Sequence, residues 1–230
     1  MIKDLGLPTN GIVLGNGPSR SNLDLHTLKE QAVIYGCNAL HRDFTPDVLF
    51  ANDRNMVLEI LRKGYSGRCV FHEWDTVPTD TADFICFYDK HGNELLLKEE
   101  YGTKENSTDM VFLPTKEHKV FIYLSPDIKH YTWVKNSYKW GAGTGINALH
   151  YALQHGGHHT ITLYGFDSVT SPGNWTNVYD GTPQYDDNGK RLECKTKGIP
   201  YSPTHGEEWI NHIEELRASF PHIEIKVSRG

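Results

Sequence analysis

The stretch Gly11-Ile-Val-Leu-Gly-Asn-Gly-Pro-Ser19 predicts a buried strand that ends in a glycine turn. Its apolar run at 12–14 is bounded by turn residues, which is typical of an inner strand of a parallel sheet. Gly15 and Gly17 let the backbone approach a ligand without an intervening Cβ, and Ser19 suits a capping position. We therefore expect the turn to hold an anion such as a nucleotide phosphate.

The turn differs from the two common phosphate-binding motifs. It is neither a GxGxxG fingerprint nor a GxxxxGK[ST] loop, because Arg20 follows Ser19 and no Lys-Ser or Lys-Thr pair stands in the required place. A tight strand-to-helix turn that needs glycine only for its backbone explains the same residues. The motif by itself leaves both interpretations open.

The composition is that of a globular domain. A chain of 230 residues is long enough for one α/β domain with a substantial core, but not for two full domains. The hydrophobic fraction of 38% and the charged fraction of 23% are ordinary for such a domain. A formal net charge of -6 argues against a large non-specific surface for nucleic acid.

Targeting and metal signals are absent from the sequence. No stretch approaches the ~20 apolar residues of a membrane span, and residues 1–6 lack the regions of a signal peptide, so we expect a cytoplasmic protein. The cysteines are widely spaced without a CxxC pair, which favours buried free thiols. The run His155-Gly-Gly-His-His159 lacks the spacing of a zinc motif, so no metal site is assigned.

Strands and helices alternate along much of the chain. Apolar runs predict strands at 12–14, 32–35, 47–51, 69–71, 160–164 and 223–227, and helical spacing predicts helices at 23–28, 56–63, 146–153 and 207–218. Residues 74–139 break this rhythm and predict irregular or antiparallel structure that covers one face. We therefore expect one α/β domain over 1–230, a doubly wound, mostly parallel, Rossmann-like sheet with 74–139 as a covering insertion.

Polar residues recur at the ends of the predicted strands. They are Asn16, Ser19, Asn38, Asn52, Asp53 and Asp167, with Thr144 at the start of a helix. Because ligands bind outside the carboxyl edge of such sheets, we expect these residues to share a pocket. The stretch 168–203 is rich in Gly, Pro, Asn, Asp and Tyr and predicts a lid loop, in which Trp175 and Tyr179 would stack on a ligand or pin the loop.

Five motifs resemble, in their order and approximate spacing, the bacterial single-domain sialyltransferases that use cytidine nucleotides. They are Gly15-Asn-Gly-Pro-Ser19, Gly36-Cys-Asn38, Gly143-Thr-Gly-Ile146, Leu163-Tyr-Gly-Phe-Asp167 and Ser202-Pro-Thr-His205. The resemblance implies a glycosyltransferase that moves a sugar from a nucleotide donor, with a CMP-sugar favoured, to an acceptor hydroxyl by direct displacement. The acceptor would be a glycan, a small molecule or a modified DNA base, and no cofactor would be required.

The resemblance also implies roles for particular residues. His205 would be the general base, which suits a side chain with a pKa near neutrality, and Tyr179, Tyr185 or Tyr201 would stabilise the leaving phosphate. Asn16, Gly17 and Ser19 would lie near the phosphate, Asn38 and Asn52 near the ribose or base, and Thr144 and Gly145 at the nucleotide or donor sugar. The full set of expected nucleotide-binding residues is Gly15, Asn16, Gly17, Pro18, Ser19, Asn38, Asn52, Asp53, Thr144 and Gly145.

Two alternatives stay open. Asn38-Ala-Leu, followed by Pro46-Asp47 and Asp53, resembles the 6-hydroxymethylpterin diphosphokinase-like family, which implies an enzyme that uses ATP and Mg²⁺, with Asp53 and Asp167 as metal ligands. Asp53 departs from the sialyltransferase pattern: it would hold Mg²⁺, bind a ribose hydroxyl or pair with Arg54. The other alternative is a nucleotide-binding module without catalysis. Hydrolysis is not favoured, and a homo-oligomer is left open.

Overall fold

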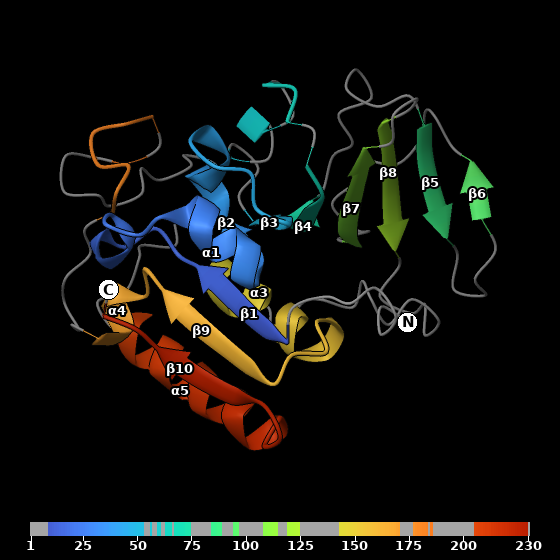
Figure 1. Ribbon diagram of the computed structural model, residues 1–230. Coiled ribbons are helices and arrows are strands. Elements are labelled where there is room, and N and C mark those ends of the chain that lie inside the picture. Colours follow the sequence, from blue (N-terminus) through green and yellow to red (C-terminus); the bar gives the residue numbers. More distant parts are fainter. Residues whose placement is uncertain are drawn as a thin grey trace.

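The computed structural model describes residues 9–52, 56, 59–60, 63–65, 67–74, 84–88, 94–96, 108–114, 119–124, 143–170, 177–183, 185 and 205–229. Its strands form one ten-stranded sheet in the order β10-β9-β1-β2-β3-β4-β7-β8-β5-β6 (Figure 1). The first six strands in that order are all parallel; they are β10 (Glu224–Val227), β9 (Thr160–Tyr164), β1 (Asn10–Leu14), β2 (Val33–Cys37), β3 (Val48–Ala51) and β4 (Cys69–Trp74). This confirms the expected α/β, Rossmann-like sheet.

The order of the parallel strands reverses beside β1. From β1 the sheet grows in one direction through β2, β3 and β4, and in the other direction through β9 and β10. The carboxyl ends of β1 and β9 are therefore neighbours, with Leu14 opposite Tyr164 in the register. Such a topological switch point is where ligands bind in open α/β sheets.

The remaining strands extend the sheet beyond β4. They are β5 (Phe84–Tyr88), β6 (Glu94–Leu96), β7 (Thr108–Pro114) and β8 (Lys119–Leu124). β7 pairs antiparallel with both β4 and β8, as expected, whereas β5 pairs parallel with β8. Strands β5 to β8 thus lengthen the sheet, with β7 paired to the edge of β4. The rest of the stretch 74–139 lies outside the described residues.

Short helices follow the strands. They are η1 (Pro18–Arg20), α1 (Leu25–Gln31), η2 (Asn38–Arg42), α3 (Thr144–His155), α4 (Asp167–Thr170) and α5 (His205–Ser219). α1 starts at residue 25 because the Asp24 side chain caps it, accepting hydrogen bonds from the amides of His26 and Thr27. In the predicted helix 56–63, Met56, Glu59 and Ile60 are helical, whereas Lys63 lies in a turn.

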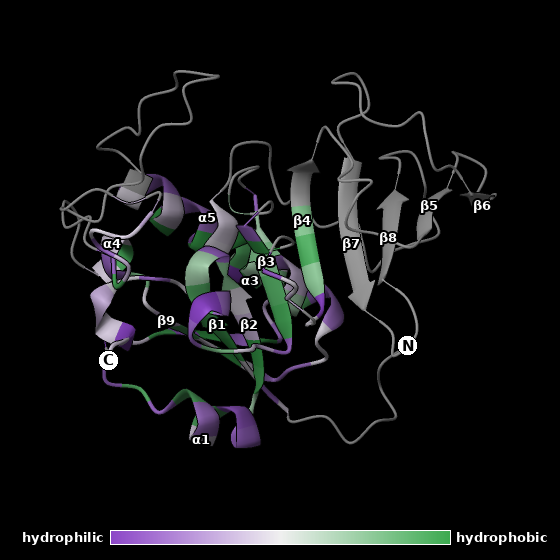
Figure 2. Ribbon diagram, turned by 90° about the horizontal axis from the view of Figure 1, so that it is seen from above, coloured by the Kyte–Doolittle hydropathy of each residue, from purple (hydrophilic) through white to green (hydrophobic). Residues whose placement is uncertain are grey.

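Two apolar layers pack against the two faces of the parallel sheet. Side chains of β1 alternate between them: Ile12 and Leu14 belong to the cluster packed with α1, and Val13 to the cluster packed with α3 and α5. Figure 2 shows the hydrophobic strands between a largely hydrophilic α1 on one side and α3 on the other. Cys37 and Cys69 are buried free thiols, as expected, and burial raises the pKa of Cys37 to about 12.

Candidate functional site

Two glycine turns meet where the order of the strands reverses. The amide of Gly15 donates to the carbonyl of Tyr164 at 2.8 Å, and the amide of Gly17 donates to the carbonyl of Gly165 at 3.0 Å. A Cβ on Gly15 would lie 2.5 Å from the Gly165 oxygen, and Gly165 itself has φ +72°. The glycines in the turn after β1 therefore allow it to lie directly against the turn after β9.

A carboxylate of the chain itself occupies the turn after β1. The amide of Ser19 donates to Asp167 Oδ1 at 3.1 Å, and its hydroxyl donates to Oδ2 at 2.9 Å. A Cβ on Gly17 would lie only 1.9 Å from Asp167 Oδ2. Three amides expected to hold a phosphate, those of Gly15, Gly17 and Ser19, thus bind internal acceptors in this structure, and Pro18 between them has no N–H.

Asn16, Asn38 and Thr144 form a second group at the same edge of the sheet. Asn16 Nδ2 donates to the carbonyl of Cys37, the last residue of β2, at 3.2 Å. This contact fixes the orientation of the amide, and among the described residues nothing donates to the buried Asn16 Oδ1. Asn38 has φ +51°, and its Oδ1 accepts from Thr144 Oγ1 at 3.3 Å. The end of β1, the end of β2 and the start of α3 are therefore connected through predicted site residues.

The N-cap residue of α3 is a glycine, which has no side chain to cap the helix. The amides of the first turn therefore receive no side-chain acceptor from Gly143. These amides and the helix dipole favour an anion at Thr144 and Gly145. Both glycines permit close packing, because a Cβ would lie 2.4 Å from the Trp209 ring at Gly143 and 2.8 Å from the Phe166 ring at Gly145.

His205 is the first residue of α5, and its side chain lies outside the described part of the structure. Trp209 follows one helical turn later, on the same face of the helix and roughly 6 Å along the axis. The Trp209 ring contacts Gly143, so the backbone of residue 205 lies one turn of α5 away from a contact with the start of α3. Asn52 directly follows β3, whereas Asp53 and Tyr201 lie outside the described residues.

Tyr179 and Tyr185 are buried in the apolar layer that contains α1. The Tyr179 hydroxyl accepts from Arg20 Nη2 at 2.7 Å and donates to Asp43 Oδ1 at 2.5 Å, and burial raises its pKa. The amide of Val178 donates to the carbonyl of Asn16 at 2.8 Å. The described part of the expected lid, residues 177–183 and 185 (hereafter the tyrosine segment), is thus attached to the edge of the sheet.

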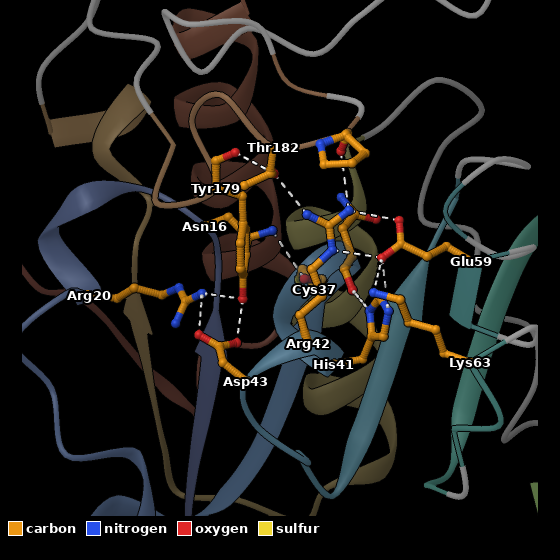
Figure 3. A network of polar contacts seen from close by, with 12 residues as sticks. Asn16, Arg20, Cys37, His41, Arg42, Asp43, Glu59, Lys63, Tyr179 and Thr182 are labelled. Atoms are coloured by element: carbon orange, nitrogen blue, oxygen red, sulfur yellow. Dashed lines mark hydrogen bonds and ion pairs between the residues drawn. The ribbon is translucent and has the colours of Figure 1, made fainter.

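An arginine on η2 also holds the tyrosine segment (Figure 3). Arg42 forms two hydrogen bonds of 2.7 Å to the carboxylate of Glu59, and it donates to Thr182 Oγ1 at 2.8 Å and to the Pro183 carbonyl at 3.2 Å. The hydrogen bonds from Arg42 lower the pKa of Glu59 to about 2. Sequence reasoning missed both Arg42 and Arg20. The only signal was the position of Arg20, directly after the glycine turn.

Within the described ranges, no group of three or more His, Cys, Asp or Glu side chains is placed to hold a metal ion. Nor does any helix there have the length and apolar character needed to cross a membrane.

No family model matches the chain, and searches of curated proteins and of solved structures found no match. Functional inference therefore depends on the residues of the site.

Proposed function

We propose that the chain is a nucleotide-sugar-dependent glycosyltransferase, with a CMP-sugar as the favoured donor. The observation that supports this proposal most directly is the connection of Asn16, Asn38 and Thr144 at the switch point of the sheet. Amide and hydroxyl groups at such an edge suit the ribose and base of a nucleotide. The order of the sequence motifs favours the cytidine donor.

The donor phosphate belongs, in this proposal, at the N-terminus of α3. The turn after β1 already binds the Asp167 carboxylate, which would repel a second anion there. The first turn of α3 receives no side-chain cap from Gly143 and carries the positive end of the helix dipole. As the sugar is displaced, negative charge grows on the leaving phosphate, and these amides would stabilise it.

His205 is the proposed general base. It would accept the proton of the acceptor hydroxyl while that oxygen bonds to the anomeric carbon and the bond from this carbon to the phosphate oxygen breaks. The position of residue 205 supports this role, because it lies one turn of α5 before Trp209, whose ring contacts Gly143 at the start of α3. No metal ion is needed in this scheme.

Thermal stabilisation by a panel of nucleotides tests the proposal. CMP, CDP, UDP, GDP, ADP and ATP are added to the full chain with and without Mg²⁺, because a ligand that binds only the folded state raises its melting temperature. We expect a shift with CMP that does not need metal. A shift confined to ATP with Mg²⁺ and lost in Asp53→Ala would contradict the proposal and favour the diphosphokinase-like alternative.

The His205→Ala variant separates binding from catalysis. It should keep the CMP shift and lose transfer from the CMP-sugar by about 100-fold or more, the usual contribution of a general base. His222→Ala is the matched control, since this exposed histidine lies just before β10 and should leave transfer unchanged. Donor binding by the unchanged chain without turnover on any acceptor class would instead indicate a binding module.

A further inference from the structure

Arg20 is a buried cation at the carboxyl edge of the sheet. It is the last residue of η1, only 4% exposed, and it directly follows the turn after β1. Its Nη2 donates to the Tyr179 hydroxyl, and the Tyr179 ring lies over the guanidinium at 5.3 Å. Among the described residues, nothing accepts a hydrogen bond from its Nε. Within the described part of the chain, this buried donor is therefore unsatisfied.

The carboxylate of Asp43 neutralises Arg20 poorly. Asp43 Oδ2 is 3.9 Å from Arg20 Nη2, and the Asp43 side chain is 55% exposed. The Tyr179 hydroxyl bridges the two groups, so Arg20 reaches this carboxylate mainly through a neutral oxygen. A guanidinium has five N–H donors, and a buried one is stabilised best by an oxyanion that accepts two of them together.

We propose that Arg20 anchors an oxyanion subsite, for a phosphate or a carboxylate of the substrate, beneath the tyrosine segment. In this structure the Tyr179 hydroxyl occupies the position of one oxygen of that anion. Asp43 competes with the anion for the positive charge of Arg20. Arg20 contacts Tyr179 in the layer that contains α1, whereas α3 packs on the opposite face, so this is a second anion position. The inference rests on the proposed function only for the identity of the ligand.

The subsite predicts opposite effects from neighbouring substitutions. Arg20→Gln removes the cation and should weaken binding of the anion at least tenfold. Asp43→Asn removes the competing charge, and Tyr179→Phe keeps the ring but removes the hydroxyl that now satisfies Nη2, so each should tighten binding several-fold. A tyrosine that only anchors the segment would not produce this pattern.

Titration calorimetry on the full chain tests the subsite, with inorganic phosphate in one arm and glucuronate in the other. Arg217→Gln is the matched control, because this arginine on α5 pairs with Glu214 and bonds the Ile225 carbonyl on β10. We expect the unchanged chain and the Arg217→Gln variant to bind phosphate, glucuronate or both, with the same affinity in the two proteins. The anion whose affinity falls in Arg20→Gln identifies whether the oxyanion is a phosphate or a carboxylate. Should Arg20→Gln fail to fold, the two tightening variants still decide the outcome.

Absence of tightening in both Asp43→Asn and Tyr179→Phe would overturn the subsite, as would equal affinity in Arg20→Gln. Titration with CMP in the same variants separates this inference from the proposed function. If CMP binds equally well with and without Arg20, and neither anion depends on Arg20 for binding, the subsite is overturned and the nucleotide proposal stands. Anion binding that depends on Arg20, without binding of any nucleotide, would support the subsite and contradict the proposed function.

Discussion

At the scale of single residues, Asp167 acts as a built-in anion for the turn after β1. Its carboxylate accepts from both the amide and the hydroxyl of Ser19, and the Ser19 hydroxyl accepts in turn from the amide of Gly165 at 3.2 Å. One acidic side chain thereby joins the turns that follow β1 and β9. Charge-assisted hydrogen bonds of this kind are stronger than neutral ones.

Asp167→Ala should lower the free energy of unfolding by about 2 kcal/mol, because it leaves the amide and hydroxyl of Ser19 without their acceptor. Urea denaturation measures this loss, with Glu30→Ala on the exposed side of α1 as the control. A loss no larger than that of the control would show that water replaces the carboxylate without penalty.

The same variant should bind phosphate more tightly if the turn itself holds the nucleotide, as the sequence predicts.

At the scale of elements, the tyrosine segment is held by contacts from η1, η2 and the turn after β1. The Arg42 guanidinium lies 5.5 Å from the Tyr179 ring while it bonds Glu59 and Thr182. Glu59 also accepts a hydrogen bond from the exposed side chain of Lys63. Arg42 therefore connects the tyrosine segment to the helical residue Glu59.

Arg42→Gln should release the tyrosine segment, since it removes the donors to Thr182 and Pro183 together with the ion pair to Glu59. Hydrogen exchange at residues 178–185 is expected to accelerate about tenfold or more, which corresponds to a local loss of roughly 1.4 kcal/mol. Lys63→Gln is the control, because it removes another cation from Glu59 without touching the segment. Equal exchange in both variants would mean that the contacts of Tyr179 and Val178 hold the segment without Arg42.

The sequence allowed most of the parallel strands to be predicted within a few residues, because runs such as 12–14 and 160–164 are short, apolar and bounded by turn residues. The sequence also allowed us to predict that Asn16, Asn38 and Thr144 lie at one edge of the sheet. Pairing of β7 with β4 was not predictable, since register depends on partners far apart in the chain. Nor was the burial of Tyr179, because a tyrosine suits both a core and a ligand-facing loop.

At the scale of the whole molecule, two groups make stability depend on pH in separate windows. Hydrogen bonds from Arg42 lower the pKa of Glu59 to about 2 from 4.5, and burial lowers the pKa of His155 to about 4 from 6.5. The His155 ring packs against Tyr151 with 4.7 Å between ring centroids. In each window the unfolded chain binds the proton first, so stability falls as the pH falls.

The free energy of unfolding should therefore decline in two stages on acidification. Between about pH 6.5 and pH 4 the decline comes from His155 and, with the same sign, from His41, whose pKa burial also lowers. Below about pH 4.5 it comes from Glu59, and His155 and Glu59 each contribute on the order of 2 kcal/mol. Denaturant titrations from pH 8 to pH 3 measure the profile. His155→Gln should flatten the upper stage and Glu59→Gln the lower one, whereas an upper stage that persists in His155→Gln would assign it to another histidine.

The close approach of the turns after β1 and β9 means that changes in one turn are limited by the other, in evolution and in protein engineering. Each turn occupies the space that a side chain on the other would need, since a Cβ on Gly165 would lie 2.7 Å from the Gly15 oxygen. The two loops, some 150 positions apart in the sequence, therefore form one transplantable unit. A chimera that takes residues 15–19 from this chain has to take 165–167 with them, and an insertion in either loop disturbs both.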